Sequence, residues 1–355
     1  MITRKKTREL SFGGVSIGGE NPILIQSMTN TPTEDVEATY WQIRALEEAG
    51  CEAVRLAVPT LESAKTFSEL RRRNIRMPLV ADIHYDYRIA LRAICEGADK
   101  IRINPGNIGS REHTLEVVRA AKSAGVPIRI GVNSGSLEES ILKKYGAPTP
   151  EALVESALYH AKILEDSDFF DICISVKASN VVDMIRANQL LSAAVDYPIH
   201  LGVTEAGASR SAVVKSSVGI GTLLAQGIGD TVRVSLTDEP VEEIVVAKEI
   251  LSSLGLYAHG KMDIVSCPTC GRTSIDLIRL VAHFEERVRA LGLDKKPLRI
   301  ALMGCGVNGP GEARECDLGI AGGKGEGLVF KKGKILYKVK EEHLVDALIE
   351  EIYKM

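Results

Sequence analysis

Short apolar runs recur at regular intervals through the first two thirds of the chain, and a segment with helical periodicity follows each of them. The periodic segments include residues 35–50 and 112–125, and Gly or Pro often precedes the next apolar run. The apolar runs, each predicted to be a strand, lie at residues 23–28, 53–58, 78–83, 100–105, 128–132, 172–177, 199–204 and 231–236. Single strand–helix units would fit a doubly wound open sheet equally well, but eight units within about 250 residues favour a closed (β/α)₈ TIM barrel.

The pattern changes on either side of this array. Residues 12–19 predict a small hairpin before the first strand. The last helix of the array ends near Gly255, and a strand, a helix at 274–292, a strand at 298–304, a Gly-rich hairpin and a terminal helix follow. We therefore expect an α/β protein with two domains, a TIM barrel at residues 1–258 and a smaller α/β domain at 259–355.

Composition limits the partners. The 355 residues carry a formal net charge of −3, which indicates no general affinity for nucleic acid or anionic membranes. The sequence contains no run of 18 apolar residues, so no membrane helix is predicted. The basic N-terminus lacks the apolar stretch of a signal peptide. The seven cysteines are an odd number, and no export signal is predicted. We therefore expect reduced thiols and a cytoplasmic protein.

Cationic residues gather where the predicted strands end. Alternate strand residues share a face, and barrel enzymes bind substrates at the carboxyl ends of their strands. The residues at these ends are Arg55, Asp82, His84, Arg102, Asn104, Arg129, Asn133, Ser175, Lys177, Thr204, Glu205, Arg233 and Ser235. Ordinary surface cations would be the simplest explanation for one strand, but five of the eight strands carry Arg or Lys there. We expect a diphosphate-binding mouth, in which Asp82, His84 and Glu205 either transfer protons or hold an arginine.

The cysteines predict a metal site in the second domain. Cys267 and Cys270 form half of a site, but Cys305 has no Cys or His two to five residues away, as a zinc ribbon would need. Three thiolates at this spacing suggest an iron–sulfur cluster with one further ligand. Glu312 and Cys316 are equal candidates for that ligand on spacing alone.

Several motifs, in order along nearly the whole chain, resemble the 4-hydroxy-3-methylbut-2-enyl diphosphate synthase family of the methylerythritol phosphate route to isoprenoids. They are QSMTN (26–30), VADIHYDYRIAL (80–91), RINPGNIG (102–109), RIGVNSGSLE (129–138), SVKAS (175–179), GVTEAG (202–207), GIGDTVRVSL (227–236), CPTCGR (267–272) and VNGPGEA (307–313). One departure is Gly306, where the family more often has a branched apolar residue; it affects only the packing of its loop.

The resemblance implies a [4Fe-4S] cluster held by Cys267, Cys270, Cys305 and Glu312. It also implies 2-C-methyl-D-erythritol 2,4-cyclodiphosphate as the substrate. The implied substrate-binding residues are Arg55, Arg102, Asn104, Arg129, Asn133, Lys177, Thr204, Arg233 and Ser235. The implied catalytic residues are Asp82, His84, Glu205 and Glu312, with Glu205 as the preferred proton donor and Glu312 as the ligand at the reactive corner of the cluster.

The implied reaction is a reductive dehydroxylation that opens the ring with two electrons from a flavodoxin or a ferredoxin. The resemblance also implies a homodimer, and the linker favours one. The eighth barrel helix runs about 22 Å away from the mouth, and the linker after it reaches at most about 18 Å. The second domain is therefore better placed to cap the mouth of a partner subunit.

Two other functions remain possible from the residues alone. One is a zinc-dependent, phosphate-handling barrel enzyme such as an aldolase, which would be colourless and contain zinc. The other makes the C-terminal domain a nucleic-acid or partner-binding module, which the acidic pI near 6.2 and the lack of a basic stripe disfavour.

Overall fold

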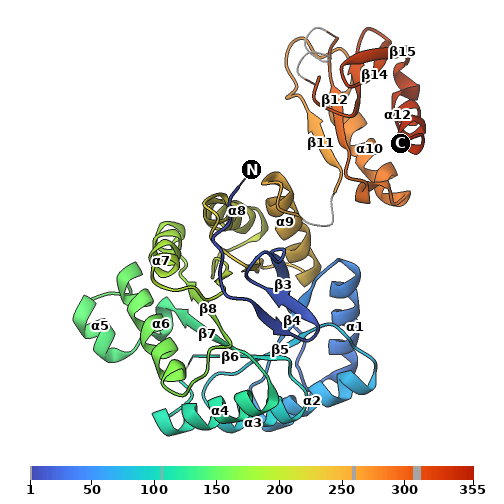
Figure 1. Cartoon of the computed structure of the whole chain (residues 1–355). Helices are drawn as coiled ribbons and strands as arrows, with labels where there is room; N and C mark the ends of the chain where they lie inside the picture. Colours follow the sequence, from blue (N-terminus) through green and yellow to red (C-terminus); the bar gives the residue numbers. More distant parts are fainter. Residues whose placement is uncertain (1, 105–106, 258–260, 307–312) are drawn as a thin grey trace. The chain divides into compact units, whose positions relative to one another are not determined.

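The computed structural model describes residues 2–104, 107–257, 261–306 and 313–355. They divide into two compact units, Met1–Leu256 and Tyr257–Met355 (Figure 1). The boundary predicted from the sequence, between residues 258 and 259, falls in a segment outside the described residues.

Eight parallel strands form the central sheet of the first unit, in the order β8-β7-β6-β5-β4-β3-β10-β9. A parallel bridge between Ile174 and Ile199 links β8 to the start of β9 and thereby closes the sheet. The predicted TIM barrel is therefore confirmed. The strands are β3 (Leu24–Met28), β4 (Ala53–Ala57), β5 (Leu79–Asp82), β6 (Lys100–Ile103), β7 (Ile128–Asn133), β8 (Ile172–Lys177), β9 (His200–Leu201) and β10 (Thr231–Val232).

Strands β9 and β10 are shorter than the predicted runs, because regular pairing ends at Leu201 and Val232, just before the residues of the mouth. Every residue of β5, β6 and β8 is buried. Helices cover the outside of a TIM barrel and side chains fill its inside, so both faces of its strands are buried.

Helices follow the strands and form the outer layer (Figure 1). They are α1 (Val36–Glu48), α2 (Leu61–Arg72), α3 (Tyr87–Cys95), α4 (Arg111–Ala124), α5 (Glu139–Tyr145), α6 (Pro150–Glu165), α7 (Val181–Ala194), α8 (Ser209–Ala225) and α9 (Pro240–Ser253). Helix α5 is an additional element between β7 and α6 that the sequence analysis did not predict. No helix among the described residues combines the length and the apolar character that crossing a membrane requires.

Local sequence explains where these helices begin and end. Asp35 accepts a hydrogen bond from the backbone of Ala38 at the start of α1. At the start of α2, Thr60 and Ser63 form a reciprocal capping box that satisfies backbone N–H groups without a partner in the helix. Helix α4 ends at Gly125, whose φ of 65° lies in the left-handed region that glycine adopts without steric cost.

The predicted N-terminal hairpin packs against the barrel. Strands β1 (Leu10–Phe12) and β2 (Val15–Ile17) pair antiparallel, and their buried side chains form one apolar cluster with Leu24, Ala53 and Val80. Leu24 and Ala53 begin their strands, so the hairpin covers the amino ends of the barrel strands, opposite the mouth.

The second unit is a five-stranded mixed sheet in sequence order with helices α10 (Leu277–Ala290) and α12 (Leu344–Tyr353). Its strands are β11 (Asp263–Ser266), β12 (Arg299–Met303), β13 (Leu318–Gly322), β14 (Glu326–Lys331) and β15 (Lys334–Lys340). Strands β11, β12 and β13 are parallel, whereas β13, β14 and β15 form an antiparallel meander. The Gly-rich segment that predicted one hairpin thus contains three strands, because both Gly-containing turns reverse the chain.

Candidate functional site

A cavity of about 320 Å³ opens at the carboxyl ends of the barrel strands. Its lining residues are Arg55, Asp82, His84, Arg102, Arg129, Asn133, Ser175, Lys177, Thr204, Glu205, Arg233 and Ser235. All the site residues predicted in the barrel are therefore brought together here, except Asn104. Asn104 is buried after β6 without lining the cavity.

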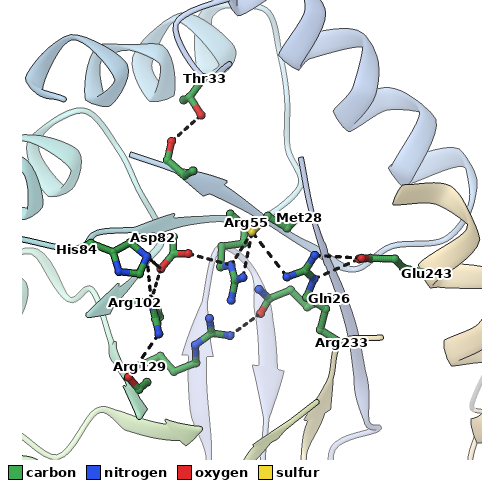
Figure 2. A network of polar contacts seen from close by, with 12 residues as sticks. Gln26, Met28, Thr33, Arg55, Asp82, His84, Arg102, Arg129, Arg233 and Glu243 are labelled. Carbon is green, nitrogen blue, oxygen red and sulfur yellow. Dashed lines mark hydrogen bonds and ion pairs between the residues drawn. The ribbon is translucent and has the colours of Figure 1, made fainter. Parts of the chain in front are cut away.

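Asp82 joins two of the cavity arginines (Figure 2). Its Oδ1 lies 2.9 Å from Nη1 of Arg102, and its Oδ2 lies 3.4 Å from Nε of Arg55. Burial opposes ionisation of Asp82, but the charge of Arg55, the hydrogen bond from His84 and the charge of Arg102 hold the pKa of its carboxyl well below the usual value. Asp82 is therefore an ionised carboxylate that holds guanidinium groups in place, and such a group is a poor proton donor.

His84 and Asn133 extend this group. Nε2 of His84 lies 3.2 Å from Nη1 of Arg102. With the amide oriented so that its oxygen faces Arg102, Asn133 accepts a hydrogen bond of 3.0 Å from Nη2. The guanidinium of Arg102 is thus held at both of its terminal nitrogens.

Of the cations that line the cavity, Arg129 and Lys177 have no carboxylate partner among the described residues. Arg129 is 1% exposed, and its Nη1 donates to Oε1 of Gln26 at 3.3 Å (Figure 2). Burial and the nearby Arg102 lower the pKa of Arg129 to about 10. Burial, together with Arg55 and Arg233, holds the pKa of Lys177 well below the usual value. An anion in this cavity would relieve the repulsion among these groups.

Arg233 is held by a carboxylate that the sequence analysis did not select. Its Nη2 and Nε donate to Oε1 and Oε2 of Glu243 at 3.0 and 3.2 Å. Met28 lies between the neighbouring guanidiniums, with its Sδ 3.0 Å from Nη2 of Arg55 and 3.7 Å from Nη1 of Arg233. The acidic first turn of α9 could have indicated Glu243 from the sequence. It contains two adjacent glutamates, however, and the sequence does not show which of them is buried.

Two glycines were also missed, although a glycine inside a strand is a recognisable signal of close approach. A Cβ added at Gly131 would lie 2.3 Å from Nε of Arg102, and one at Gly202 would lie 2.9 Å from Nζ of Lys177. These glycines leave the space that the two long cationic side chains occupy.

Glu205 differs from the buried groups. It is exposed at the rim of the cavity and has a φ of 52°, an uncommon left-handed conformation for a residue other than glycine. Such conformations often occur at functional sites, where surrounding structure maintains them.

Further polar residues lie inside the barrel and escaped the sequence analysis. His200 is fully buried, and its Nδ1 lies 2.7 Å from Oγ1 of Thr231. Burial and the charge of Arg129 hold the pKa of His200 well below the usual value, so the imidazole is neutral. Lys100 is 1% exposed, its Nζ lies 3.5 Å from the centre of the Phe12 ring, and burial lowers its pKa to about 7.

In the second unit, the predicted metal-binding cysteines follow two neighbouring parallel strands. Cys267 and Cys270 follow β11, and Cys305 follows β12, so all three lie at one edge of the sheet. The two loops are hydrogen-bonded, because Gly304 N donates to Sγ of Cys267 at 3.2 Å and Ser274 N donates to the carbonyl of Gly304 at 2.8 Å. Glu312 lies outside the described residues.

Cys316 lies at the other edge of this sheet. It precedes β13, which runs parallel to β12 with Ile300 opposite Leu318. By this register, Cys316 and Cys267 lie about five strand residues apart, roughly 16 Å. Among the residues that the structure describes, no group of three or more His, Cys, Asp and Glu side chains is close enough to hold a metal ion.

Comparisons with known proteins match both units. The GcpE TIM-barrel domain matches residues 7–248, and the GcpE protein C-terminal domain matches residues 263–354. Among solved structures, the dihydropteroate synthase of Yersinia pestis aligns with 70% of this chain and 97% of its own, at 12% identity and a TM-score of 0.49. That likeness carries no functional argument.

Two curated relatives cover almost the whole chain, and both are named 4-hydroxy-3-methylbut-2-en-1-yl diphosphate synthase (flavodoxin). The protein of Caldanaerobacter subterraneus subsp. tengcongensis is 58% identical over 99% of this chain and 98% of its own length. The protein of Clostridium perfringens is 58% identical over 98% of this chain and 99% of its own. On these two domain matches and this identity, the chain belongs to the GcpE family.

Proposed function

We propose that this chain converts 2-C-methyl-D-erythritol 2,4-cyclodiphosphate to 4-hydroxy-3-methylbut-2-enyl diphosphate, a step in the biosynthesis of isoprenoid precursors. In this reaction a ring C–O bond breaks with a phosphate oxygen as the leaving group, and a hydroxyl departs as water after protonation. Two electrons are consumed. The observation that carries the proposal is a cavity lined by several cations, in a chain that matches named synthases over nearly its full length.

The cavity suits a diphosphate. Arg55, Arg102, Arg129, Lys177 and Arg233 bring positive charge to it, and the buried carboxylates beside them are Asp82 and Glu243. Arginine binds phosphate oxygens with two nitrogens at once, so these side chains can both bind the diphosphate and stabilise the charge of the leaving phosphate. Thr204, Ser235 and Asn133 add neutral hydrogen-bonding groups.

Glu205 is the best candidate to protonate the departing hydroxyl. It lies at the exposed rim of the cavity and forms no ion pair with any other described residue, so it can exchange protons with solvent. Asp82 is kept ionised by its arginines and would position them instead. His84 lies against both Asp82 and Arg102 and would support that arrangement.

We further propose that Cys267, Cys270, Cys305 and Glu312 hold a [4Fe-4S] cluster. When bound, such a cluster supplies electrons one at a time. The three cysteines are free, follow adjacent strands and lie on loops that are hydrogen-bonded, which fits this group. A backbone N–H donated to Sγ of Cys267 would also stabilise a thiolate ligand. The distant position of Cys316 disfavours it as the fourth ligand.

The electron donor and the assembly are part of the proposal. Because the relatives carry flavodoxin in their names, flavodoxin is the donor that we infer. Helix α9 begins beside the mouth and ends at the opposite end of the barrel, and only three residues separate its last residue, Ser253, from Tyr257, where the second unit begins. This route favours a homodimer in which the cluster unit of one subunit caps the barrel of its partner.

Anaerobic purification followed by iron and sulfide analysis, a visible spectrum and an activity assay tests the function. We expect a brown protein with about four irons per chain that reduces the cyclic diphosphate when flavodoxin supplies electrons. Cys267→Ser should lose iron and activity, whereas Cys316→Ala should retain both, and Glu312→Ala should alter the spectrum and weaken turnover. A pale protein that contains zinc and does not turn over the substrate would refute the proposal.

A further inference from the structure

We propose that Glu243 is a positioning residue for diphosphate binding and that it acts through Arg233. The inference rests on the proposed function and adds a residue outside the cavity lining. Glu243 lies on α9 and is 3% exposed, so it reaches the site only through the groups that it holds.

Both carboxylate oxygens of Glu243 are fully used. Oε1 accepts from Nη2 of Arg233 at 3.0 Å and from the backbone N–H of Leu236 at 3.3 Å. Oε2 accepts from Nε of Arg233 at 3.2 Å and from Oγ of Ser27 at 2.7 Å. Four donors from β3, from the segment after β10 and from Arg233 therefore converge on one buried carboxylate, which makes the pair geometrically rigid.

The pairing leaves one edge of Arg233 for a ligand. Nε and Nη2 face Glu243, and Nη1 points to the opposite side, where it donates a hydrogen bond of 3.7 Å to Sδ of Met28 (Figure 2). A thioether is a weak, neutral acceptor, so it fixes the direction of Nη1 without neutralising the positive charge. Arg233 is thus aimed into the cavity, with Nε and one N–H of Nη2 bound to Glu243.

Glu243 also joins the first and last strands of the barrel where their ladder ends. Strands β3 and β10 pair only at Leu24 with Thr231 and Ile25 with Val232. Beyond these pairs, Glu243 connects Ser27 on β3 with Arg233 and Leu236 after β10. Since the first turn of α9 carries a positive partial charge, it favours a carboxylate at this position. Loss of the carboxylate should therefore displace the side chain of Arg233 while the barrel stays folded.

Glu243→Gln tests the inference, with Glu242→Gln as its matched control. Both variants remove one negative charge from the same turn of α9, but Glu242 is exposed. In the full-length holoenzyme, we expect Glu243→Gln to raise KM for the cyclic diphosphate about tenfold to a hundredfold, with kcat changed much less. Calorimetry with inorganic pyrophosphate should show an equal loss of affinity. The control should stay within twofold of the wild type in both measurements.

A double-mutant cycle separates positioning from a general structural effect. If Glu243 acts through Arg233, then Glu243→Gln should change KM by less than about twofold when Arg233 is already Gln. An equal effect in both backgrounds, or an unchanged KM in Glu243→Gln, would overturn the inference. Should Glu243→Gln not fold, Glu243→Asp takes its place, because its shorter carboxylate cannot reach both nitrogens of Arg233. A wild-type chain that binds neither pyrophosphate nor the cyclic substrate would instead overturn the proposed function.

Discussion

Arg102 and Lys177 have room inside the barrel because two neighbouring residues, Gly131 in β7 and Gly202 directly after β9, have no side chain. Gly131 lies against the guanidinium of Arg102, and Gly202 lies against the ammonium of Lys177. A typical barrel interior is filled by Val, Ile and Leu, whereas two of the long cations at this mouth lie against glycines. The site therefore requires the two glycines that make room for these side chains as well as the cationic side chains themselves.

Gly131→Ala should displace Arg102, because the new Cβ would lie 2.3 Å from its Nε. We expect kcat/KM to fall about tenfold to a hundredfold, since small misplacements of binding groups have effects of this size. Gly221→Ala, within helix α8, is the matched control, since a Cβ added there meets no atom of the described residues within 4 Å. Steady-state kinetics of both variants provide the measurement, and equal kinetics would contradict the role of Gly131.

Lys177 should make diphosphate binding dependent on pH. Its pKa is depressed by burial and by neighbouring arginines, and a bound diphosphate would raise that pKa. Binding therefore takes up a proton. The contribution to affinity is fully present below the pKa of the free protein and is lost as the pH rises through the higher pKa of the complex.

Calorimetry with pyrophosphate in two buffers of different ionisation enthalpy measures this proton uptake. Affinity should weaken as the pH rises toward the ordinary lysine pKa of about 10.4. Lys177→Arg is the control, because arginine stays protonated in both states. Identical heats in the two buffers for the wild type would show that Lys177 does not titrate on binding.

At the scale of elements, the N-terminal hairpin closes the end of the barrel away from the cavity. Phe12 is 4% exposed, packs in the apolar cluster of the hairpin and lies over the buried Nζ of Lys100. Substitutions at the hairpin end of the barrel should therefore change stability without changing ligand binding at the cavity end.

Phe12→Ala should lower the free energy of unfolding by about 3 kcal/mol or more, because it leaves a cavity in a packed cluster. KM should stay unchanged, since the substrate cavity lies at the other end. Ser11→Ala, on the exposed face of the same strand, should change stability by less than about 0.5 kcal/mol. Urea unfolding measures both effects, and a raised KM in Phe12→Ala would contradict the separation.

The same scale explains the cysteine pattern of the second unit. Cys267, Cys270 and Cys305 follow adjacent parallel strands, whereas Cys316 precedes the next one. Parallel strands place their carboxyl ends together, so sequence order around a strand decides which residues can meet. The spacing of 11 residues between Cys305 and Cys316 carries no such information by itself.

At the scale of the whole molecule, α9 carries the chain from the mouth to the far end of the barrel before the second unit begins. The proposed reaction would need both the proposed cluster and the cavity, and the proposed dimer would supply them from different chains. Each active site would then consist of the barrel of one subunit and the cysteines of its partner.

Mixed dimers test this arrangement. A Cys267→Ser chain and an Arg129→Gln chain should each be inactive alone. After dissociation, mixing and reassociation in equal amounts, we expect about a quarter of the wild-type activity, because half of the dimers are mixed and each has one intact site. Reassociation of each variant by itself is the control. No recovery would contradict a site shared between subunits.

Much of this architecture could be predicted from local sequence. Apolar runs and helical periodicity are determined by neighbouring residues, so the eight strand–helix units, the hairpin and the second domain were predictable. Five strands each carry one cation near the carboxyl end, where the strands of a barrel meet, which predicted that Arg55, Arg102, Arg129, Lys177 and Arg233 would lie together. Only tertiary structure decided which of two adjacent glutamates is buried against Arg233, which glycines make room, and that Lys100 and His200 lie inside the barrel. These facts depend on contacts between residues far apart in the chain, and such contacts follow from strand register and barrel closure rather than from local pattern.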